Sequence, residues 1–398
     1  MATKRRAETQ SLRLSRSSLR CQMAEPTELT ELRVGFDIGP LFGERTGVGF
    51  AVDSLRTALL QRDDVELREY LVSFRARVGA DVLRLPLPAA LAHRLWARLD
   101  WPRADRWLGG ATGVSVLHGT NYVVPPSTLP RLVSVYDCWF LRNPGEARPA
   151  VDRAGKVLRR AVAAGAVVHA SSHASAQAVR ELLPGARVTT VHLGALELPA
   201  PPTRAPIGDL DGAPFIVAVG KLERRKNLPT LIKAFGELTT TFPDLHLVLA
   251  GSDGDDRPAI DAAVDSLGAA SNRVSFAGRI EDDVRSWLLH HASVLAYPSL
   301  DEGFGFPLLD AMQAGVPIVA SNAGSIPEVG GEAVLLGEPN DIATLASNLS
   351  VAINDSAVRA RLIAAGNARW REFTWQKCAH ELTAVYKRLA NGEADAWL

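Results

Sequence analysis

The chain has 398 residues, with 44 basic and 44 acidic side chains and 47% hydrophobic residues. This length exceeds what one hydrophobic core usually supports, so we expect two domains. The even charge balance argues against a nucleic-acid-coating surface and against a disordered acidic chain, and any anion site must therefore be local.

The cysteines and the first residues indicate where the chain works. Cys21, Cys138 and Cys378 lie far apart and form no CxxC pair, which favours neither a disulfide framework nor a zinc site. The sequence shows no apolar run of about 18 residues, the length of a membrane span. Residues 1–30, rich in Arg and Ser, predict a disordered basic arm. We expect a cytoplasmic protein, with at most peripheral contact at the inner face of the membrane.

From residue 32 onward, short apolar runs alternate with helical patterns. In the first half the runs cover residues 32–39, 114–120, 131–137, 166–172 and 187–194. Nearly continuous apolar strands of this kind are typical of parallel sheets that are buried on both faces. We therefore expect an N-terminal Rossmann-like domain over residues 31–200.

A second alternating series follows a proline-rich segment. Residues 198–214 contain five prolines and predict an extended linker. Beyond it, strands are expected at 214–220, 245–251, 273–280, 293–299, 317–321 and 333–339, and helices at 227–241, 257–269, 281–291 and 307–315. This alternation predicts βαβ units and a second doubly wound domain over residues 201–374. The ligand site is then expected in a cleft beyond the carboxyl ends of the strands.

Glycines and cations stand where the first strand of each half ends. Gly47 and Gly49 open a helix and let backbone amides approach an anion, although a plain tight turn explains them equally well. In the second half, GKLERRKN (220–227) ends a strand, and Asn227 is expected to cap the next helix. Its cations at a helix start suit a phosphate or diphosphate, with a solvated charge run as the alternative.

The segment DEGFGFPLLDAMQAG (301–315) combines an anion-binding pattern with carboxylates. Gly303 and Gly305 loosen the loop, and Pro307 is expected in the first turn of a helix. A carboxylate such as Glu302 beside that helix start repels phosphate, but it suits the hydroxyls of a polyol. A nucleotide-diphosphate sugar, with an anionic centre between hydroxyl-rich ends, fits this pattern. Helix capping alone would explain Glu302 but not the glycines.

These segments, in this order, resemble the group-1 (family 4) retaining glycosyltransferases of GT-B fold, which include bacterial mannosyltransferases. The resemblance runs from about residue 32 to residue 389 and is densest over 215–339, in GKLERRKN, RVSFAGRI and YPSLDEGFGFPLLDAMQAGVPIVASNAGSIPEVGG. It implies an α/β architecture of two Rossmann-like, doubly wound parallel-sheet domains that face a central cleft. The first domain would bind the acceptor and the second the donor, and a C-terminal helix within 375–398 would cross back to the first.

The resemblance also assigns roles to residues. Lys221 and Lys226 match the basic pair at the donor diphosphate, and Glu302 matches the first acid of the E-x7-E motif, beside the transferred sugar. Asp310 takes the second acid position, at the ribose, where the family has Glu. The expected donor-binding set is Gly47, Gly49, Gly220, Lys221, Arg225, Lys226, Gly303, Phe304, Gly305, Phe306, Pro307, Leu308 and Asp310.

A second departure lies in SVYDCWF, where Tyr136 replaces a histidine that contacts the sugar in many members, while Asp137 remains. Either Tyr136 or His118 covers this role, or the site has changed. The expected catalytic residues are Glu302, Lys226, Lys221, Asp137, Tyr136 and His118. Ser172 matches a family position near the floor of the cleft.

The resemblance implies transfer of a mannose- or glucose-type hexose, with retention, from a GDP- or UDP-sugar to a saccharide or lipid-linked saccharide, in polysaccharide or glycoconjugate biosynthesis. The sequence places no DxD-type pair at this cleft, so no metal and no other cofactor is expected, and no nucleic-acid partner either. The alternatives are a non-catalytic nucleotide-sugar-binding relative and a nucleotide-sugar epimerase.

Overall fold

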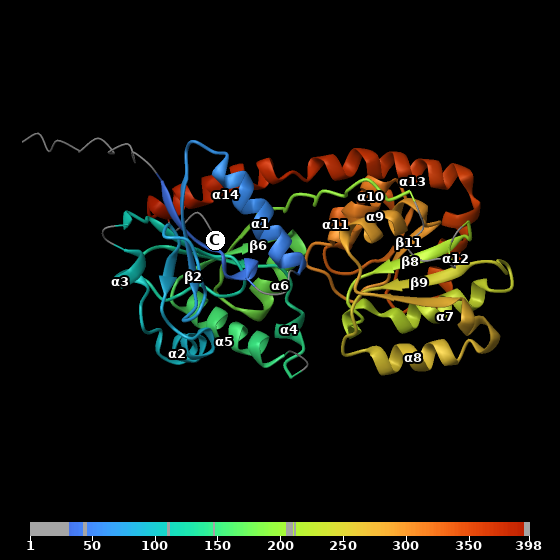
Figure 1. Ribbon diagram of the computed structural model, residues 1–398, viewed down its shortest axis with the longest axis horizontal. Helices are drawn as coiled ribbons and strands as arrows, with labels where there is room; N and C mark the ends of the chain where they lie inside the picture. Colours follow the sequence, from blue (N-terminus) through green and yellow to red (C-terminus); the bar gives the residue numbers. More distant parts are fainter. Residues whose placement is uncertain are drawn as a thin grey trace, which may run out of the picture. The chain divides into compact units, whose positions relative to one another are not determined.

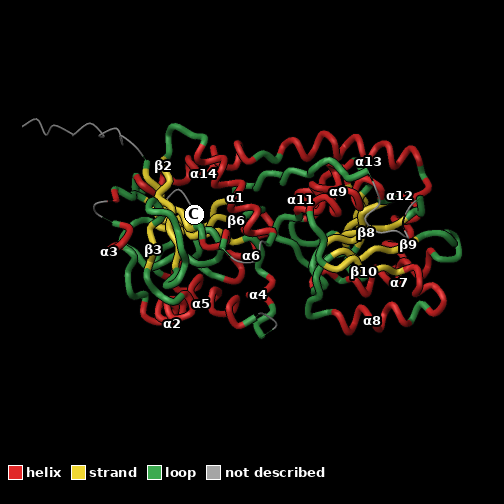
Figure 2. The backbone as a smooth tube through the Cα atoms, in the orientation of Figure 1, coloured by secondary structure: helices red, strands yellow, loops and turns green. Residues whose placement is uncertain are grey.

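A computed structural model describes residues 32–42, 46–109, 112–145, 148–203, 210 and 212–393. The basic arm expected at 1–30 therefore lies outside the described residues. Among the described residues the strands form two sheets, in which all the paired strands run parallel (Figures 1 and 2). We call the first sheet and its helices the N-terminal lobe and the second sheet and its helices the C-terminal lobe.

The sheet of the N-terminal lobe has the strand order β3-β2-β1-β4-β5-β6-β7. Its strands are β1 (Arg33–Asp37), β2 (Glu66–Val72), β3 (Leu83–Leu85), β4 (Val116–Gly119), β5 (Arg131–Val135), β6 (Val167–Ala170) and β7 (Arg187–Thr190). One face packs against α1 (Gly47–Leu60) and α14 (Trp375–Ala390), and the other packs against α2 (Ala89–Leu99), α5 (Pro149–Ala163) and α6 (His173–Leu182) (Figure 1). The order reverses between β1 and β4, as in doubly wound folds.

Two strands of this lobe are not among those predicted. β3 is the edge strand and β2 lies between it and β1; β2 reads ELREYLV, with only two buried residues. Its charged residues interrupt the apolar run and hide the strand from a search for continuous apolar segments. The short helices α3 (Asp105–Leu108) and α4 (Trp139–Arg142) were also unpredicted.

The C-terminal lobe confirms the predicted series. Its sheet has the order β10-β9-β8-β11-β12-β13, with β8 (Phe215–Val219), β9 (His246–Ala250), β10 (Val274–Gly278), β11 (Val294–Tyr297), β12 (Ile318–Ser321) and β13 (Val334–Gly337). One face packs against α7 (Leu228–Leu238), α8 (Arg257–Asp265) and α12 (Ile342–Asn354). The other packs against α9 (Asp282–His291), α10 (Phe306–Ala314) and α11 (Ile326–Gly330), with α13 (Ser356–Arg369) beside α10 (Figure 1).

The last helix, α14, rests on the N-terminal lobe. It packs against α1, and Lys387 Nζ lies 2.7 Å from Asp64 Oδ2. At its start, Trp375 Nε1 donates to the carbonyl of Ala195 at 2.9 Å. The residue boundaries of the predicted domains stay predictions. In the part of the chain that the structure describes, no helix combines the length and the apolar character needed to cross a bilayer.

Candidate active site between the lobes

The predicted donor-binding segments meet where two neighbouring strands of the C-terminal sheet end. GKLERRKN follows β8 and the loop 298–305 follows β11, which pairs with β8. The amide of Leu300 donates to the carbonyl of Arg225 at 2.7 Å and ties the two segments together. The parallel sheet thus brings together charged residues that lie about 75 positions apart in the chain.

Glu302 is the centre of this site. Its Oε1 lies 2.5 Å from Lys226 Nζ, and its Oε2 accepts from Arg225 Nη1 at 2.8 Å. Only 6% of Glu302 and 7% of Lys226 is exposed. Burial opposes ionisation of Glu302, but the charges of Arg225 and Lys226 outweigh it and lower its pKa to about 2. Glu302 is therefore a carboxylate throughout the physiological pH range.

A second carboxylate, Glu223, contacts both Lys221 and Arg225. Glu223 Oε1 accepts from Lys221 Nζ at 2.9 Å, and its Oε2 accepts from Arg225 Nε at 3.2 Å. Burial lowers the pKa of Lys226, and the charge of Glu302 opposes this effect. A Cβ on Gly220, where φ is +145°, would lie 3.0 Å from Lys226 Cε. This position is therefore kept free for the lysine stem.

Asn227 differs from its prediction. It stands at the start of α7, but its side chain accepts no helix amide. Instead Nδ2 donates to the carbonyls of Pro298 at 3.2 Å and Pro339 at 2.6 Å. Asn227 therefore anchors neighbouring loops at the edge of the sheet, and the predicted cap is wrong.

The start of α10 has the predicted form. Gly305 (φ +99°) precedes the helix, Pro307 lies in its first turn, and Gly315 (φ +69°) ends it. Phe304 is buried against Phe306, and Leu308 lies fully in the core. A Cβ on Gly47 would lie 3.9 Å from the ring of Phe306, so the glycine turn of the N-terminal lobe reaches the start of α10.

Gly49 has a local contact instead. A Cβ on Gly49 would lie 3.1 Å from the carbonyl of Pro40, within the same lobe. Its amide lies 3.5 Å from Oγ1 of Thr46, and Thr46 caps α1. Gly49 thus allows the close turn at the start of α1.

Gly303 joins the two lobes directly. Its carbonyl lies 3.0, 2.8 and 3.1 Å from the hydroxyls of Ser171, Ser172 and Ser175, and the first and last of these also lie 3.0 Å from the carbonyl of Tyr136. A Cβ on Gly303 would stand 1.6 Å from Tyr136 O, so no larger residue fits. The three serine hydroxyls thus donate hydrogen bonds to two backbone carbonyls, one from each lobe. Because C=O and N–H point in opposite directions in a trans peptide, this contact also fixes the direction of the following amide N–H.

Asp310 is buried one turn into α10, with only 2% of its surface exposed. Burial raises its pKa to about 6, and Arg285, whose Nη1 lies 3.4 Å from Oδ2, lowers it only in part. Oδ1 has no hydrogen-bond partner among the described residues. A buried carboxylate oxygen without a protein partner needs another hydrogen-bond partner, such as water or a ligand.

His118 and Tyr136, the two residues expected near the sugar, make their hydrogen bonds inside the N-terminal lobe and to α14. His118 is fully buried; Nδ1 lies 2.7 Å from Tyr386 Oη on α14, and Nε2 lies 2.8 Å from Ser134 Oγ on β5, so both ring nitrogens are engaged. Tyr136 Oη donates to the carbonyl of Thr120 at 2.8 Å. These contacts turn both side chains into the N-terminal lobe, and a contact of either one with the sugar stays a prediction.

Asp137 stays close to the charged cluster. Its Oδ1 accepts from the amide of Trp139 at 3.2 Å. Burial raises its pKa, Arg225 lowers it, and the nearby Glu302 raises it further. Asp137 is thus the residue of the SVYDCWF pattern that lies within reach of the charges of Arg225 and Glu302.

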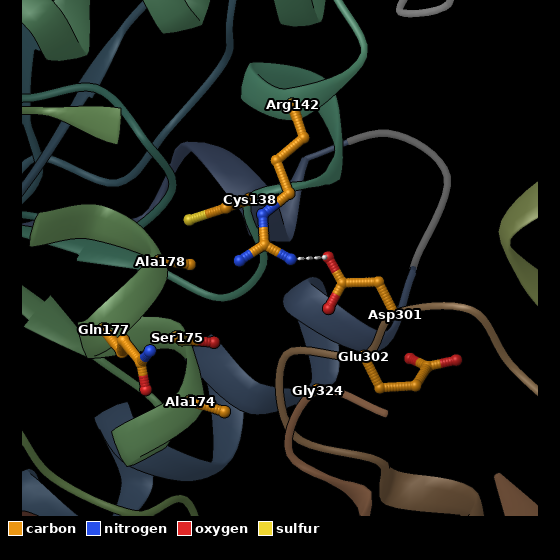
Figure 3. Close-up of a pocket in the computed structure, with 9 residues that line it drawn as sticks. All are labelled: Cys138, Arg142, Ala174, Ser175, Gln177, Ala178, Asp301, Glu302 and Gly324. Atoms are coloured by element: carbon orange, nitrogen blue, oxygen red, sulfur yellow. Dashed lines mark ion pairs between the residues drawn. The ribbon is translucent and has the colours of Figure 1, made fainter. Parts of the chain in front are cut away.

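A polar pocket of about 200 Å³ lies beside Glu302 and is lined by both lobes (Figure 3). Its lining residues are Cys138, Arg142, Ala174, Ser175, Gln177, Ala178, Asp301, Glu302 and Gly324. Arg142 Nη1 lies 3.5 Å from Asp301 Oδ2, the ion pair drawn in Figure 3, which spans the pocket between the lobes. Charged and hydroxyl groups around a small pocket suit a ligand that is rich in hydroxyls.

Several residues of the cleft escaped the sequence reasoning. Asp37 ends β1, its Oδ1 accepts from the amide of Gly39 at 2.8 Å, and burial raises its pKa to about 7. Its place at the carboxyl end of a central strand is a signal that could have revealed it. Arg142 and Asp301 carry no comparable signal, because only the meeting of the lobes pairs them.

Comparisons with known proteins agree with this architecture. Residues 202–369 match the family of glycosyl transferases group 1. The O-antigen chain mannosyltransferase B of Escherichia coli is 27% identical over 302 residues, which make up 73% of this chain and 79% of that protein. The sucrose-phosphate synthase of Thermosynechococcus elongatus has a TM-score of 0.70 at 19% identity, over 91% of this chain and 100% of its own. Anabaena HepE in complex with UDP and glucose has a TM-score of 0.64 at 17% sequence identity. The match covers 90% of this chain and 100% of the HepE chain.

The two parallel sheets and the solved structures that share them define a two-domain α/β protein of GT-B fold. Within that class, residues 202–369 match the group 1 glycosyl transferases, and the mannosyltransferase relative extends the similarity over 302 residues of the chain. The resemblance drawn from the sequence is thereby confirmed.

Proposed function

We propose that this glycosyltransferase moves a mannose- or glucose-type hexose from a GDP- or UDP-sugar to a saccharide or lipid-linked saccharide, with retention at the anomeric carbon. The observation that carries the proposal is the buried cluster of Lys226, Arg225 and Glu302 beside the start of α10. The mannosyltransferase relative supports a hexose donor, and HepE with UDP and glucose supports a nucleotide site on this fold. The product would belong to a polysaccharide or glycoconjugate.

In this mechanism the departing diphosphate needs stabilisation most. Lys226 and Arg225 supply positive charge, and the start of α10 supplies amide groups at the positive end of a helix dipole. We propose that these groups stabilise the departing diphosphate without a metal ion.

Glu302 serves the sugar. As a carboxylate with a pKa of about 2, it is a poor proton donor. It can accept hydrogen bonds from sugar hydroxyls and stabilise the positive charge that develops at the anomeric carbon. Asp310, with its unpartnered oxygen, would accept a ribose hydroxyl, and the pocket of Figure 3 would take a hydroxyl-rich ring.

The test is a panel of UDP- and GDP-hexoses incubated with the full chain, with slow donor hydrolysis followed by NMR. We expect one nucleotide sugar to be hydrolysed, with the α-anomer as the first product from an α-linked donor and an unchanged rate in EDTA. A β-anomer as the first product would overturn retention. Loss of turnover in EDTA that Mg²⁺ restores would overturn the metal-free mechanism, and hydrolysis of no donor in the panel would count against the proposed donors.

A further inference from the structure

Away from Glu302, a second cluster joins the lobes. It consists of His173 at the first position of α6, His192 just after β7, and Glu328 in α11. One ligand atom of each residue lies within 4.8 Å of those of the other two. The two histidines belong to the N-terminal lobe and the glutamate to the C-terminal lobe, so this cluster spans the contact between them.

The carboxylate of Glu328 is oriented and charged. Oε1 accepts from the amide of His173 at 2.8 Å, and Oε2 accepts from the amide of Ala174 at 3.1 Å. Nε2 of His192 lies 2.5 Å from Oε1. Burial would raise the pKa of Glu328, but the hydrogen bonds from His192 and the two amides lower it. Backbone donors behind a carboxylate are the kind of support that orients metal ligands.

The two imidazoles differ in freedom. The ring of His192 is packed by Phe304 and Phe373, with centroids 6.5 and 5.7 Å away, which sets its orientation. His173 is exposed, and its ring stands at 82° to that of His192 with centroids 5.5 Å apart. His173 can therefore turn toward a ligand that His192 and Glu328 already hold, and solvent can reach the remaining side.

Two imidazoles and one carboxylate, with a position left for water, form a donor set that zinc prefers. Metal–ligand bonds of about 2.0–2.2 Å in tetrahedral geometry place the ligand atoms about 3.3–3.6 Å apart. The exposed His173 must close in to reach this spacing, and the shorter contact between His192 and Glu328 must open slightly. As a ligand through Nε2, a neutral His192 carries its proton on Nδ1 instead.

We propose that His173, His192 and Glu328 bind a divalent transition-metal ion of the zinc type, which bridges the two lobes. The ion takes no part in sugar transfer, because none of its ligands contacts Glu302 or Lys226 in the interactions described above. Its effect is to restrain movement of one lobe against the other. Binding of the ion does not depend on the proposed donor or acceptor.

The experiment is a titration of the chelator-treated full chain with ZnCl₂ by calorimetry, and with CoCl₂ by visible absorption. A Cys21→Ser background removes the thiol outside the described residues. The parent should bind one equivalent. His173→Ala should lower the affinity for the metal about 100-fold. Mutation of residues that only support the ligands already lowers metal affinity about 10- to 100-fold. This variant keeps the backbone amide of residue 173, which donates a hydrogen bond to Glu328, so we expect it to fold like the parent.

His380→Ala is the matched control, because His380 is an exposed histidine on α14, away from the cluster. It should bind like the parent. No binding by the parent, or equal binding by His173→Ala, would overturn the proposal. Either result would leave nucleotide binding at Lys226 untouched, so this inference and the proposed function fail separately.

Discussion

Glu302 and Asp310 lie at the two ends of one short run, and both are almost completely buried, yet their pKa values move in opposite directions. Glu302 contacts two cations at 2.5 and 2.8 Å, and its pKa is lowered to about 2. Asp310 faces one guanidinium at 3.4 Å, and its pKa is raised to about 6. Burial penalises both carboxylates, so the number and distance of the cations decide the outcome.

This difference separates two tasks within one loop and helix. A carboxylate that stays charged at every physiological pH suits the reacting sugar, where positive charge develops. A carboxylate that gains a proton near pH 6 suits a binding contact whose strength varies with pH. The following predictions test whether the two carboxylates really divide the work in this way.

The largest effect is expected for Glu302→Gln. Removing the charge beside the sugar should lower kcat about 100- to 1000-fold, the size found when one transition-state stabilising group is lost. The KM for the donor should change less than about tenfold. Steady-state kinetics with the donor from the hydrolysis panel provides the measurement. Glu237→Gln, at an exposed position of α7, is the control that should behave like the parent.

An unchanged kcat in Glu302→Gln would remove this residue from the chemistry. Because the substitution leaves the buried Lys226 without its carboxylate, while Arg225 keeps Glu223, it also destabilises the fold. Thermal unfolding with and without UDP or GDP separates this loss from the kinetic one, since a bound diphosphate would restore neutrality.

The second largest effect is expected for Lys226→Met, which should weaken nucleotide binding. The substitution keeps the buried stem and removes one charge-assisted contact, worth about 1.5–3 kcal/mol, so the Kd for UDP or GDP should rise about 10- to 150-fold. Calorimetry measures it. Lys233→Met, at an exposed position of α7, should leave the Kd unchanged. Equal binding by Lys226→Met and the parent would place the diphosphate elsewhere.

The pH dependence of stability should report on Asp310. Its folded-state pKa of about 6 lies above its usual value of 3.8, so the folded state binds the proton first. The free energy of unfolding therefore gains a contribution as pH falls through 6, and loses it as pH rises again. Between pH 7 and pH 5 this gain is about 1 kcal/mol.

Urea unfolding of the parent and of Asp310→Asn at both pH values isolates the contribution, because other titrating groups such as Asp37 are common to both chains. The parent should gain about 1 kcal/mol more than the variant on going to pH 5. Equal pH dependence in the two chains would show that Asp310 does not titrate there.

The smallest effect is expected for Arg285→Gln. Arg285 is the cation that lowers the pKa of Asp310, so its loss should move the pH dependence of stability to higher pH. The change in unfolding free energy at pH 7 should stay below about 1 kcal/mol, because the contact is long and Arg285 is partly exposed. A shift to lower pH would contradict the role given to Arg285.

The sequence by itself determined the two βαβ series and the segments that stand at their strand ends. Continuous apolar runs and turn residues are local signals, and they predicted every strand of the C-terminal lobe and the glycine-bounded helix α10. Strand ends of a parallel sheet meet at one edge, so the grouping of GKLERRKN with Glu302 also followed.

Only the tertiary structure decided which groups pair. In the folded chain, Lys226 and Arg225 form ion pairs with Glu302. Tyr136 and His118 make their hydrogen bonds inside the N-terminal lobe and to α14. Gly303 contacts the backbone of the N-terminal lobe. Pairing, burial and pKa depend on distances of a few ångströms between segments far apart in the chain. No local pattern encodes such distances, because the attraction between charges and the cost of burying them are set by the packing around them.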